Sequence, residues 1–175
     1  MRITHSFLLA ALFSLFILVP GCGSGEPVIP KSVGDLEILI VHNQYRALVG
    51  VAGLKWSEDL AEKARALIKT DSCVMLMNTE GLGQNTLSST ASVTQEFVVD
   101  LWAIIGSQYY IYDLDSCTFP LLGGHPNDEC DAYKQIVWAN SSFLGCASVH
   151  CFFQERVVWV CLYDPPGNVP GESPY

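Results

Sequence analysis

The chain has 175 residues, with nine Lys or Arg against 18 Asp or Glu, so its formal net charge is −9. An acidic surface repels phosphate backbones and anionic lipid headgroups, which argues against nucleic acids and charged membrane surfaces as partners. The length fits one domain after removal of a leader, and it is sufficient to bury a sizeable core.

The first 25 residues predict a secretory signal peptide. Arg2 gives it a positive start, residues 7–19 form an apolar run, and small residues follow at the expected cleavage point. The run is too short for a comfortable membrane span, so no stable membrane anchor is expected. Cys22 lies at the predicted boundary and is expected to be lost with the signal, and Pro20, two residues before it, makes lipidation a poor alternative. Residues 26–33 indicate a linker, which leaves 34–175 as one secreted, extracellular domain.

Six cysteines remain after the signal, and an even number in a secreted chain predicts a set of disulfides. They are Cys73, Cys117, Cys130, Cys146, Cys151 and Cys161. Six cysteines allow fifteen pairings, and the sequence alone does not choose between them. A zinc site is disfavoured because the chain has no Cys-x-x-Cys pair.

Apolar residues at three- and four-residue steps predict a first helix that begins at Asp35 and stops at Gly50. A second helix is expected after Ser57, which caps a first turn that contains Glu58 and Asp59. The apolar stripes are Leu36, Leu39 and Ile40 in the first helix, and Leu60, Ala64, Leu67 and Ile68 in the second.

A third helix is expected near the middle of the chain. The small, polar segment 87–92 before it predicts a loop, and either Ser92 or Thr94 can serve as the N-cap. Its predicted buried face consists of Phe97, Val98, Leu101, Ile104 and Ile105.

The last forty residues predict a β-rich end that starts at 135–138. Two strand-like runs, 145–151 and 157–163, are joined by the short segment 152–156, which indicates a hairpin. The prolines at positions 165, 166, 170 and 174 exclude regular structure from the tail that follows.

Several short motifs follow one another in the predicted domain. They include His42-Asn43-Gln44-Tyr45-Arg46-Ala47, Gly83-Gln84-Asn85, Gly145-Cys146-Ala147 and Cys161-Leu162-Tyr163-Asp164. Their order resembles the CAP superfamily of cysteine-rich secretory, antigen 5 and pathogenesis-related proteins, and most of all plant pathogenesis-related protein family 1. The resemblance covers 35–175 and implies an α+β fold, a three-layer α-β-α sandwich. It also implies the disulfides Cys73–Cys146, Cys117–Cys130 and Cys151–Cys161.

The resemblance further implies a central cleft, which in this family usually holds two histidines and two acidic residues. The matching positions here are Met77, Gln84, Ile105 and Ala132, so all four ionisable groups are replaced. Gly106 is an alternative to Ile105 at the third of these positions. Glu80 or Asp131 could replace one of the missing acidic residues of the cleft. We therefore expect no metal or other cofactor in the cleft. His42 and His150 are expected to have structural roles.

A less polar cleft suits a sterol or a fatty acid, and the resemblance associates plant and fungal relatives with sterol binding. We therefore interpret the chain as a secreted, monomeric, non-enzymatic defence protein that binds a lipid. The alternative that the four residues only fill the cleft as core stays open.

Two other functions remain as hypotheses. The tail, Pro165 to Tyr175, matches the family pattern of a peptide that is cut after Asp164 and acts on a receptor as a defence signal. Leu162 replaces the Asn that usually stands just upstream of the cut, and a tail packed on the sheet is the alternative.

A degenerate hydrolase is disfavoured because no serine lies in a nucleophile-elbow motif. Asn140-Ser141-Ser142 is a candidate N-glycosylation site.

Overall fold

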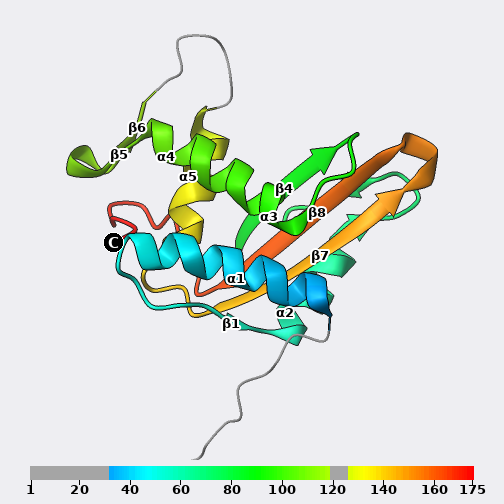
Figure 1. Ribbon diagram of the computed structural model, residues 1–175, viewed down its shortest axis with the longest axis horizontal. Coiled ribbons are helices and arrows are strands. Elements are labelled where there is room, and N and C mark those ends of the chain that lie inside the picture. Colours follow the sequence, from blue (N-terminus) through cyan, green and yellow to red (C-terminus); the bar gives the residue numbers. More distant parts are fainter. Residues whose placement is uncertain (1–31, 119–125) are drawn as a thin grey trace, which may run out of the picture.

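The computed structural model describes residues 32–118 and 126–175, so the predicted signal and most of the linker lie outside the described residues. Within this part, a four-stranded mixed sheet lies between two layers of helices (Figure 1). The strands are ordered β1 (Lys55–Trp56), β7 (Phe143–Cys151), β8 (Arg156–Asp164) and β4 (Gly83–Ser89). β1 runs parallel to β7, and the other neighbours are antiparallel. None of the helices in the described ranges is long and apolar enough to span a membrane.

The two faces of the sheet carry separate cores, which confirms the predicted α-β-α sandwich. The main helices are α1 (Val33–Leu48), α2 (Glu58–Ala66), α3 (Gln95–Asp100) and α5 (Pro126–Ile136). On one face, α1, α3 and α5 pack over Leu144 and Tyr163. On the other, α2 packs over Val158 and Leu162, because successive residues of a strand point to opposite faces. Two short ladders complete the structure, β2 (Ile68–Lys69) with β3 (Val74–Met75), and β5 (Tyr110–Ile111) with β6 (Ser116–Cys117).

The first two helices begin and end close to the predicted positions. The Ser57 hydroxyl accepts a hydrogen bond from the Leu60 amide at 3.3 Å, so Ser57 is the N-cap of α2 as expected. Ser32 caps α1 in the same way, which makes this helix start two residues earlier than predicted. Gly50 follows α1 with φ +77°, a conformation that glycine adopts without steric cost and that ends the helix.

The third helix is longer than α3 alone and buries a different face from the predicted one. It continues from α3 through a π-helical segment (Leu101–Ile105) into α4 (Gly106–Tyr109), and Thr94 is its N-cap. Its core-facing side chains are Val98, Val99, Trp102 and Ala103, whereas Phe97 and Ile104 are each 50% exposed. Apolar residues occupy nearly every side of this helix, so their periodicity did not identify the buried face.

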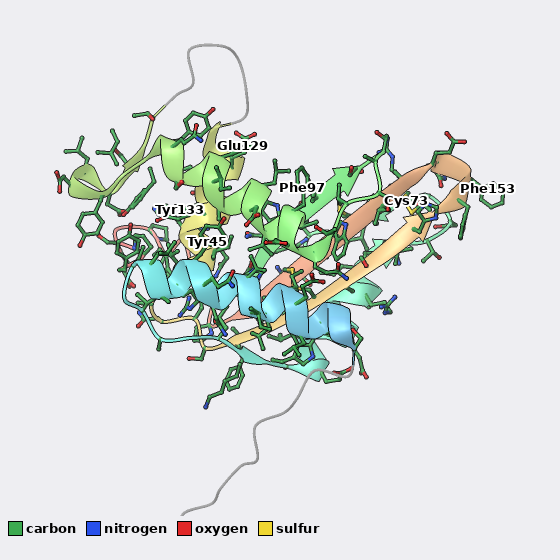
Figure 2. The ribbon with its side chains drawn as sticks, in the orientation of Figure 1. Tyr45, Cys73, Phe97, Glu129, Tyr133 and Phe153 are labelled. Carbon is green, nitrogen blue, oxygen red and sulfur yellow. A yellow bond between two sulfur atoms is a disulfide. The ribbon has the colours of Figure 1, made fainter. Side chains whose placement is uncertain are left out.

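Two segments have a different secondary structure from the predicted one. Leu87 to Ser89 is not loop but the end of β4, where pairing with Val157 to Trp159 of β8 satisfies the backbone of these small polar residues. Gln135 and Ile136 are not strand but the last turn of α5. The predicted hairpin is confirmed as β7 and β8 joined by a short 3-10 turn, with Phe153 at its far tip (Figure 2).

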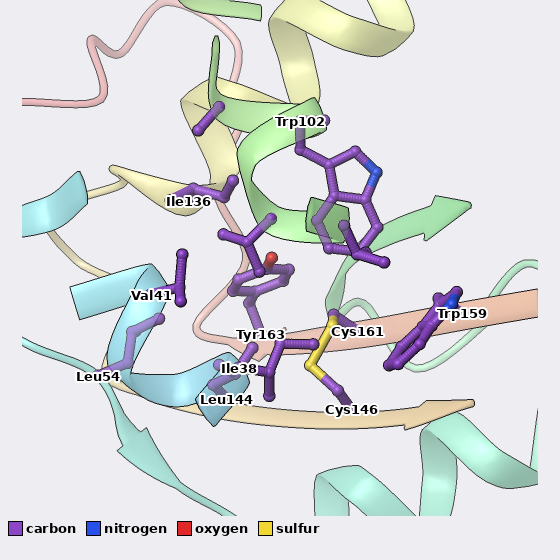
Figure 3. Packing of buried hydrophobic residues seen from close by; sticks show 14 of the residues in the cluster. Ile38, Val41, Leu54, Trp102, Ile136, Leu144, Cys146, Trp159, Cys161 and Tyr163 are labelled. Atoms are coloured by element: carbon purple, nitrogen blue, oxygen red, sulfur yellow. A yellow bond between two sulfur atoms is a disulfide. The ribbon is translucent and has the colours of Figure 1, made fainter. Parts of the chain in front are cut away.

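Two of the three disulfides implied by the resemblance are wrong. The structure contains Cys117–Cys130 as expected, but Cys73 pairs with Cys151, and Cys146 pairs with Cys161 (Figure 3). Cys146 and Cys151 are five residues apart on β7, so they point to opposite faces of the sheet. Cys146 and its cross-strand neighbour Cys161 therefore lie on the face of the sheet that α1 covers. Cys151 lies on the face that α2 covers, where it meets Cys73.

Candidate functional site

A cleft of about 590 Å³ opens between β4, the third helix, α5 and the C-terminal tail. It is lined by Met77, Gln84, Asn85, Thr86, Leu87, Leu101, Trp102, Ile105, Glu129, Asp131, Ala132 and Asn168. The structure thus brings together all four positions that the resemblance assigned to the central cleft. The residues that line the cleft come from distant parts of the sequence, between Met77 and Asn168.

Gln84 closes one end of the cleft as a structural group. Its side-chain Nε2 donates to the Leu76 carbonyl at 2.9 Å, and its Oε1 accepts from the Asn78 amide at 2.7 Å and from Asn78 Nδ2 at 3.1 Å. These bonds hold the 76–78 segment against β4, and this places Met77 at the rim of the cleft. Gln84 therefore replaces a family acid with a neutral side chain whose amide is already occupied by the protein.

Apolar side chains form the wall that the third helix and β4 provide. Leu101, Ile105 and Leu87 are partly buried, and Met77 is 74% exposed at the rim. Ile105, and not Gly106, occupies the cleft position. Gly106 is instead packed against α5, where an added Cβ would lie 2.2 Å from the Glu129 carbonyl.

Polar side chains form a second wall of the cleft, which the sequence predicted to be less polar than is usual in the family. Glu129 and Asp131 of α5 and Asn168 of the tail contribute to this wall. Of the two candidate replacement acids, Asp131 lies in the lining, whereas Glu80 pairs with Lys63 at 3.1 Å on the surface. Glu129 lies on α5, whereas Phe97 lies on α3, which contributes no residue to the lining (Figure 2).

A buried hydrogen-bonded chain leads from the floor of the cleft into the core. Asn85 Nδ2 donates to the Ala132 carbonyl at 3.0 Å and to the Tyr163 hydroxyl at 3.1 Å. His42 Nδ1 lies 2.7 Å from the Ile38 carbonyl and must donate to it, so the neutral ring accepts from Tyr163 through Nε2 at 2.8 Å. This chain fixes Asn85 and Ala132 at the floor of the cleft, and the predicted structural role of His42 is confirmed.

Neither of the two histidines in the described ranges contributes to the cleft lining. His150 lies on β7 and packs its ring against Phe152 at 4.4 Å, and His125 lies outside the described residues. Among residues 32–118 and 126–175, no group of three or more His, Cys, Asp or Glu side chains could hold a metal ion.

Sequence reasoning missed three important members of the lining, namely Leu101, Glu129 and Asn168. Leu101 was assigned to the core, although an excess of apolar residues around the third helix was the signal that some of them face a cleft. Asn168 comes from the tail and joins the site because its Nδ2 donates to the Asp131 carbonyl at 2.9 Å. Nothing local in the sequence indicates that contact.

Comparisons with known proteins agree with this architecture. The sequence profile described as "CAP: Cysteine-rich secretory protein family" matches residues 39–163. The chain is 37% identical over 145 residues to the "STS14 protein" of Solanum tuberosum, covering 79% of this chain and 64% of that protein, so it spans less than two thirds of that relative. It is 32% identical to "Pathogenesis-related protein 1" of Arabidopsis thaliana, covering 93% and 97% of the two chains. The structure titled "Crystal structure of NaASP2 with Zn2+" matches with a TM-score of 0.60 at 19% identity, covering 82% and 88% of the two chains.

Proposed function

The chain belongs to the cysteine-rich secretory protein (CAP) family, and from this membership we propose that it is a secreted, non-enzymatic defence protein that binds a sterol in its cleft. Its likeness to pathogenesis-related protein 1 makes it a defence-related CAP protein, and three disulfides fit an oxidising extracellular compartment. The side chain of Asn140 is exposed and accessible to a glycan in that compartment.

The observation that carries the proposal is the amphipathic cleft. A volume of about 590 Å³ lies within the usual range for sites that bind small molecules. Leu87, Leu101 and Ile105 provide partly buried apolar surface on one side, and Met77 extends it to the rim. An apolar ligand that covered these side chains would gain hydrophobic free energy in proportion to the area that it removes from water.

The polar groups of the cleft favour a ligand whose head donates a hydrogen bond. The side chains of Trp102, Gln84, Asn85 and Asn168 each donate at least one hydrogen bond to a protein oxygen. The acceptor Oδ1 of Asn168 is buried without a partner among the described residues, and Glu129 adds a carboxylate to the same lining. A buried acceptor without a partner is costly, so a sterol hydroxyl suits this wall better than the carboxylate of a fatty acid.

The lining residues do not suggest catalysis. Of the described residues that line the cleft, none is Ser, Cys, His or Lys, so the nucleophile and base pairs that these four residue types form are missing from it. This composition supports a binding role over the degenerate hydrolase.

The proposal predicts that Ile105→Asp weakens sterol binding by about 10–100-fold, because a charged group would replace apolar contact surface worth roughly 1.5–3 kcal/mol. Ile104→Asp is the matched control, since Ile104 is the neighbouring residue on the same helix and lies outside the cleft lining. Binding of a fluorescent sterol to the purified secreted protein gives the affinities, and thermal unfolding shows that both variants fold. Palmitate should compete at least about tenfold less well than unlabelled sterol.

Equal sterol binding by Ile105→Asp and Ile104→Asp would contradict the cleft as the site. Saturable binding of palmitate with no binding of sterol would contradict the proposal that the ligand donates a hydrogen bond to the cleft through a hydroxyl group.

A second candidate function, release of the tail as a signalling peptide, is favoured by one observation. Asp164 and Pro165, which flank the bond at which the peptide would be cut, are both exposed. The rest of the tail is held down. The Ser141 hydroxyl donates to the Pro165 carbonyl at 2.8 Å, the Gly167 amide donates to Gln135 Oε1 at 2.8 Å, and the Ala139 amide donates to the Pro174 carbonyl at 2.7 Å.

Tyrosine rings hold the end of the tail. Tyr175 stacks on Tyr112 with ring centroids 5.1 Å apart, and its hydroxyl lies 3.2 Å from that of Tyr133. Stacked aromatic rings add about 0.5–1.5 kcal/mol beyond the area that they bury. A cut after Asp164 therefore leaves most of the contacts of the tail intact.

We expect a peptide cut at this bond to stay with the domain. A protease site inserted between Asp164 and Pro165 allows a controlled cut, and size-exclusion chromatography with mass spectrometry then shows where the peptide elutes. Co-elution with the domain is the expected result, and Tyr175→Ala should increase release. Complete release at once on cutting would instead support the peptide precursor as the main function.

A further inference from the structure

A second pocket of about 250 Å³ shares no residue with the sterol cleft. It is lined by Ser32, Gly34, Asp35, Ile38, Arg65, Gln95, Cys146, Ala147, Ser148 and Trp159. The first turn of α1 and the start of α3 form its walls, and Ser148 and Trp159, which are cross-strand neighbours on β7 and β8, form its floor. Figure 3 shows the Trp159 ring beside the Cys146–Cys161 disulfide that extends the same floor.

Trp159 gives this pocket a donor that the protein does not use. The side chain is only 6% exposed, and its Nε1–H is buried without a hydrogen-bond partner among the described residues. Indole nitrogen is a donor only, so nothing but an acceptor can satisfy it. Leaving a buried donor unpaired is unfavourable, and native structures rarely do so without an occupant of the site.

The pocket also presents one charge of each sign. Arg65 and the carboxylate of Asp35 both line it, and neither side chain forms an ion pair or hydrogen bond with another described residue. The side chains of Gln95 and Ser148 likewise have no protein partner in the described ranges. The pocket thus contains a carboxylate, a guanidinium and a buried N–H donor, none of them paired with the protein. Such a pocket is complementary to a molecule that carries both a positive and a negative charge.

The shape of the pocket limits the size of that molecule. Its volume is below the 300–1,000 Å³ that is usual for drug-sized ligands. Gly34 lies close to Gln95 in its wall, because an added Cβ would lie 2.4 Å from Nε2 at the end of that side chain. Ile38 and the Cys146–Cys161 disulfide leave only a short apolar surface for the remainder of a ligand.

We propose that this pocket binds a small zwitterion, a free α-amino acid with a short side chain. Its carboxylate accepts from Trp159 Nε1 and from the guanidinium of Arg65, and its ammonium group donates to Asp35. The ligand thereby satisfies the buried indole donor and both charges at once. This site is independent of the sterol cleft, so either one can exist without the other.

The test is calorimetric titration of the secreted protein with glycine, alanine, serine and valine, one at a time, with acetate and methylamine as half-ligands. At least one amino acid should bind saturably with a dissociation constant of about 1 mM or below, and both half-ligands should bind at least about tenfold more weakly. Trp159→Phe removes the donor and keeps the ring, and it should weaken binding about tenfold or more. Arg65→Gln and Asp35→Asn should each do the same.

Lys55→Gln is the control, because Lys55 is an exposed cation outside the pocket, and it should leave the affinity unchanged. Absence of saturable binding by all four amino acids at about 10 mM would overturn the proposal. Binding that Trp159→Phe and Arg65→Gln both leave unchanged would overturn the site. Acetate binding as tightly as alanine would overturn the zwitterion. Arg65 lies on the surface, so Arg65→Gln keeps the test decisive even if Trp159→Phe fails to fold.

Discussion

Replacing Arg46 with methionine is expected to lower the free energy of unfolding by about 3–5 kcal/mol. Arg46 lies on α1 with no exposed surface, although it carries a charge. Its Nε donates to the Ala52 carbonyl at 2.7 Å, Nη1 to the carbonyls of Ile136 and Trp138 at 2.9 and 2.8 Å, and Nη2 to the Ser141 carbonyl at 3.0 Å. One guanidinium therefore joins α1 to the end of α5 and to the two loops beside them.

The physical reason for the large effect is what the substitution leaves behind. Methionine fills similar volume but donates nothing, so four carbonyls, three of them in buried hydrogen bonds, lose a charged donor. Each buried group left unsatisfied costs about 1–3 kcal/mol before relaxation. Burial lowers the pKa of Arg46 to about 10, so the side chain remains charged at neutral pH. The Ile136 carbonyl also lies at the negative end of the α5 helix dipole, which favours a cation there.

Chemical and thermal unfolding measure this effect. A loss of about 4 kcal/mol should lower Tm by roughly 10 °C in a domain of this size. Arg65→Met is the matched control, because Arg65 is exposed and has no protein partner in the described structure, and it should change stability by no more than about 0.5 kcal/mol. If Arg46→Met unfolded at the same temperature as Arg65→Met, the carbonyl network would not stabilise the fold as argued.

The second large effect is a loss of stability in mild acid that arises from His42. Burial, assisted by the nearby positive charge of Arg46, lowers the pKa of this histidine from 6.5 to about 4, and the hydrogen bond to Ile38 only partly opposes the shift. Protonation would give Nε2 a hydrogen directed at the Tyr163 hydroxyl, which now donates to that nitrogen.

The sign follows from proton binding. Between pH 6.5 and about 4 the unfolded chain binds a proton on this histidine and the folded chain does not, so stability falls as the pH falls through this range. A difference of that size corresponds to roughly 3 kcal/mol by pH 4, and this contribution is fully present above pH 6.5.

Nuclear magnetic resonance tests the shift directly. The imidazole signals of His42 should not titrate between pH 8 and 5. His42→Asn, if it folds, should lose about 3 kcal/mol less stability than the wild type between pH 7 and 4. Titration of His42 near its ordinary pKa in the folded protein would refute the buried neutral ring.

Local signals in the sequence predicted local structure well. The Ser57 cap and the hairpin between residues 145 and 163 depend on contacts a few residues apart, and the structure confirms both. The third helix was identified for the same reason, but its buried face was not. Which face of the third helix is buried depends on the side from which the sheet and α1 pack against it. A helix that is apolar on most sides does not reveal this in its sequence.

The disulfides show the limit of a resemblance. The five-residue spacing of Cys146 and Cys151 on a predicted strand already places them on opposite faces, but the face that each cysteine needs is known only once α2 and Cys73 are positioned. The cleft is the opposite case. The resemblance correctly located Met77, Gln84, Ile105 and Ala132 in one site, while its polar wall depends on tertiary contacts between α5 and the tail.

Photo-crosslinking tests the central claim, sterol binding in the cleft, most directly. A photoreactive sterol is bound to the intact purified protein, the sample is irradiated, and the crosslinks are mapped by peptide mass spectrometry. If the sterol binds in the cleft, crosslinks are expected in the third helix around Leu101 and Ile105 and in the tail around Asn168. Excess unlabelled sterol should suppress all of them. Saturable crosslinks confined to other surfaces, or no competition by unlabelled sterol, would contradict it.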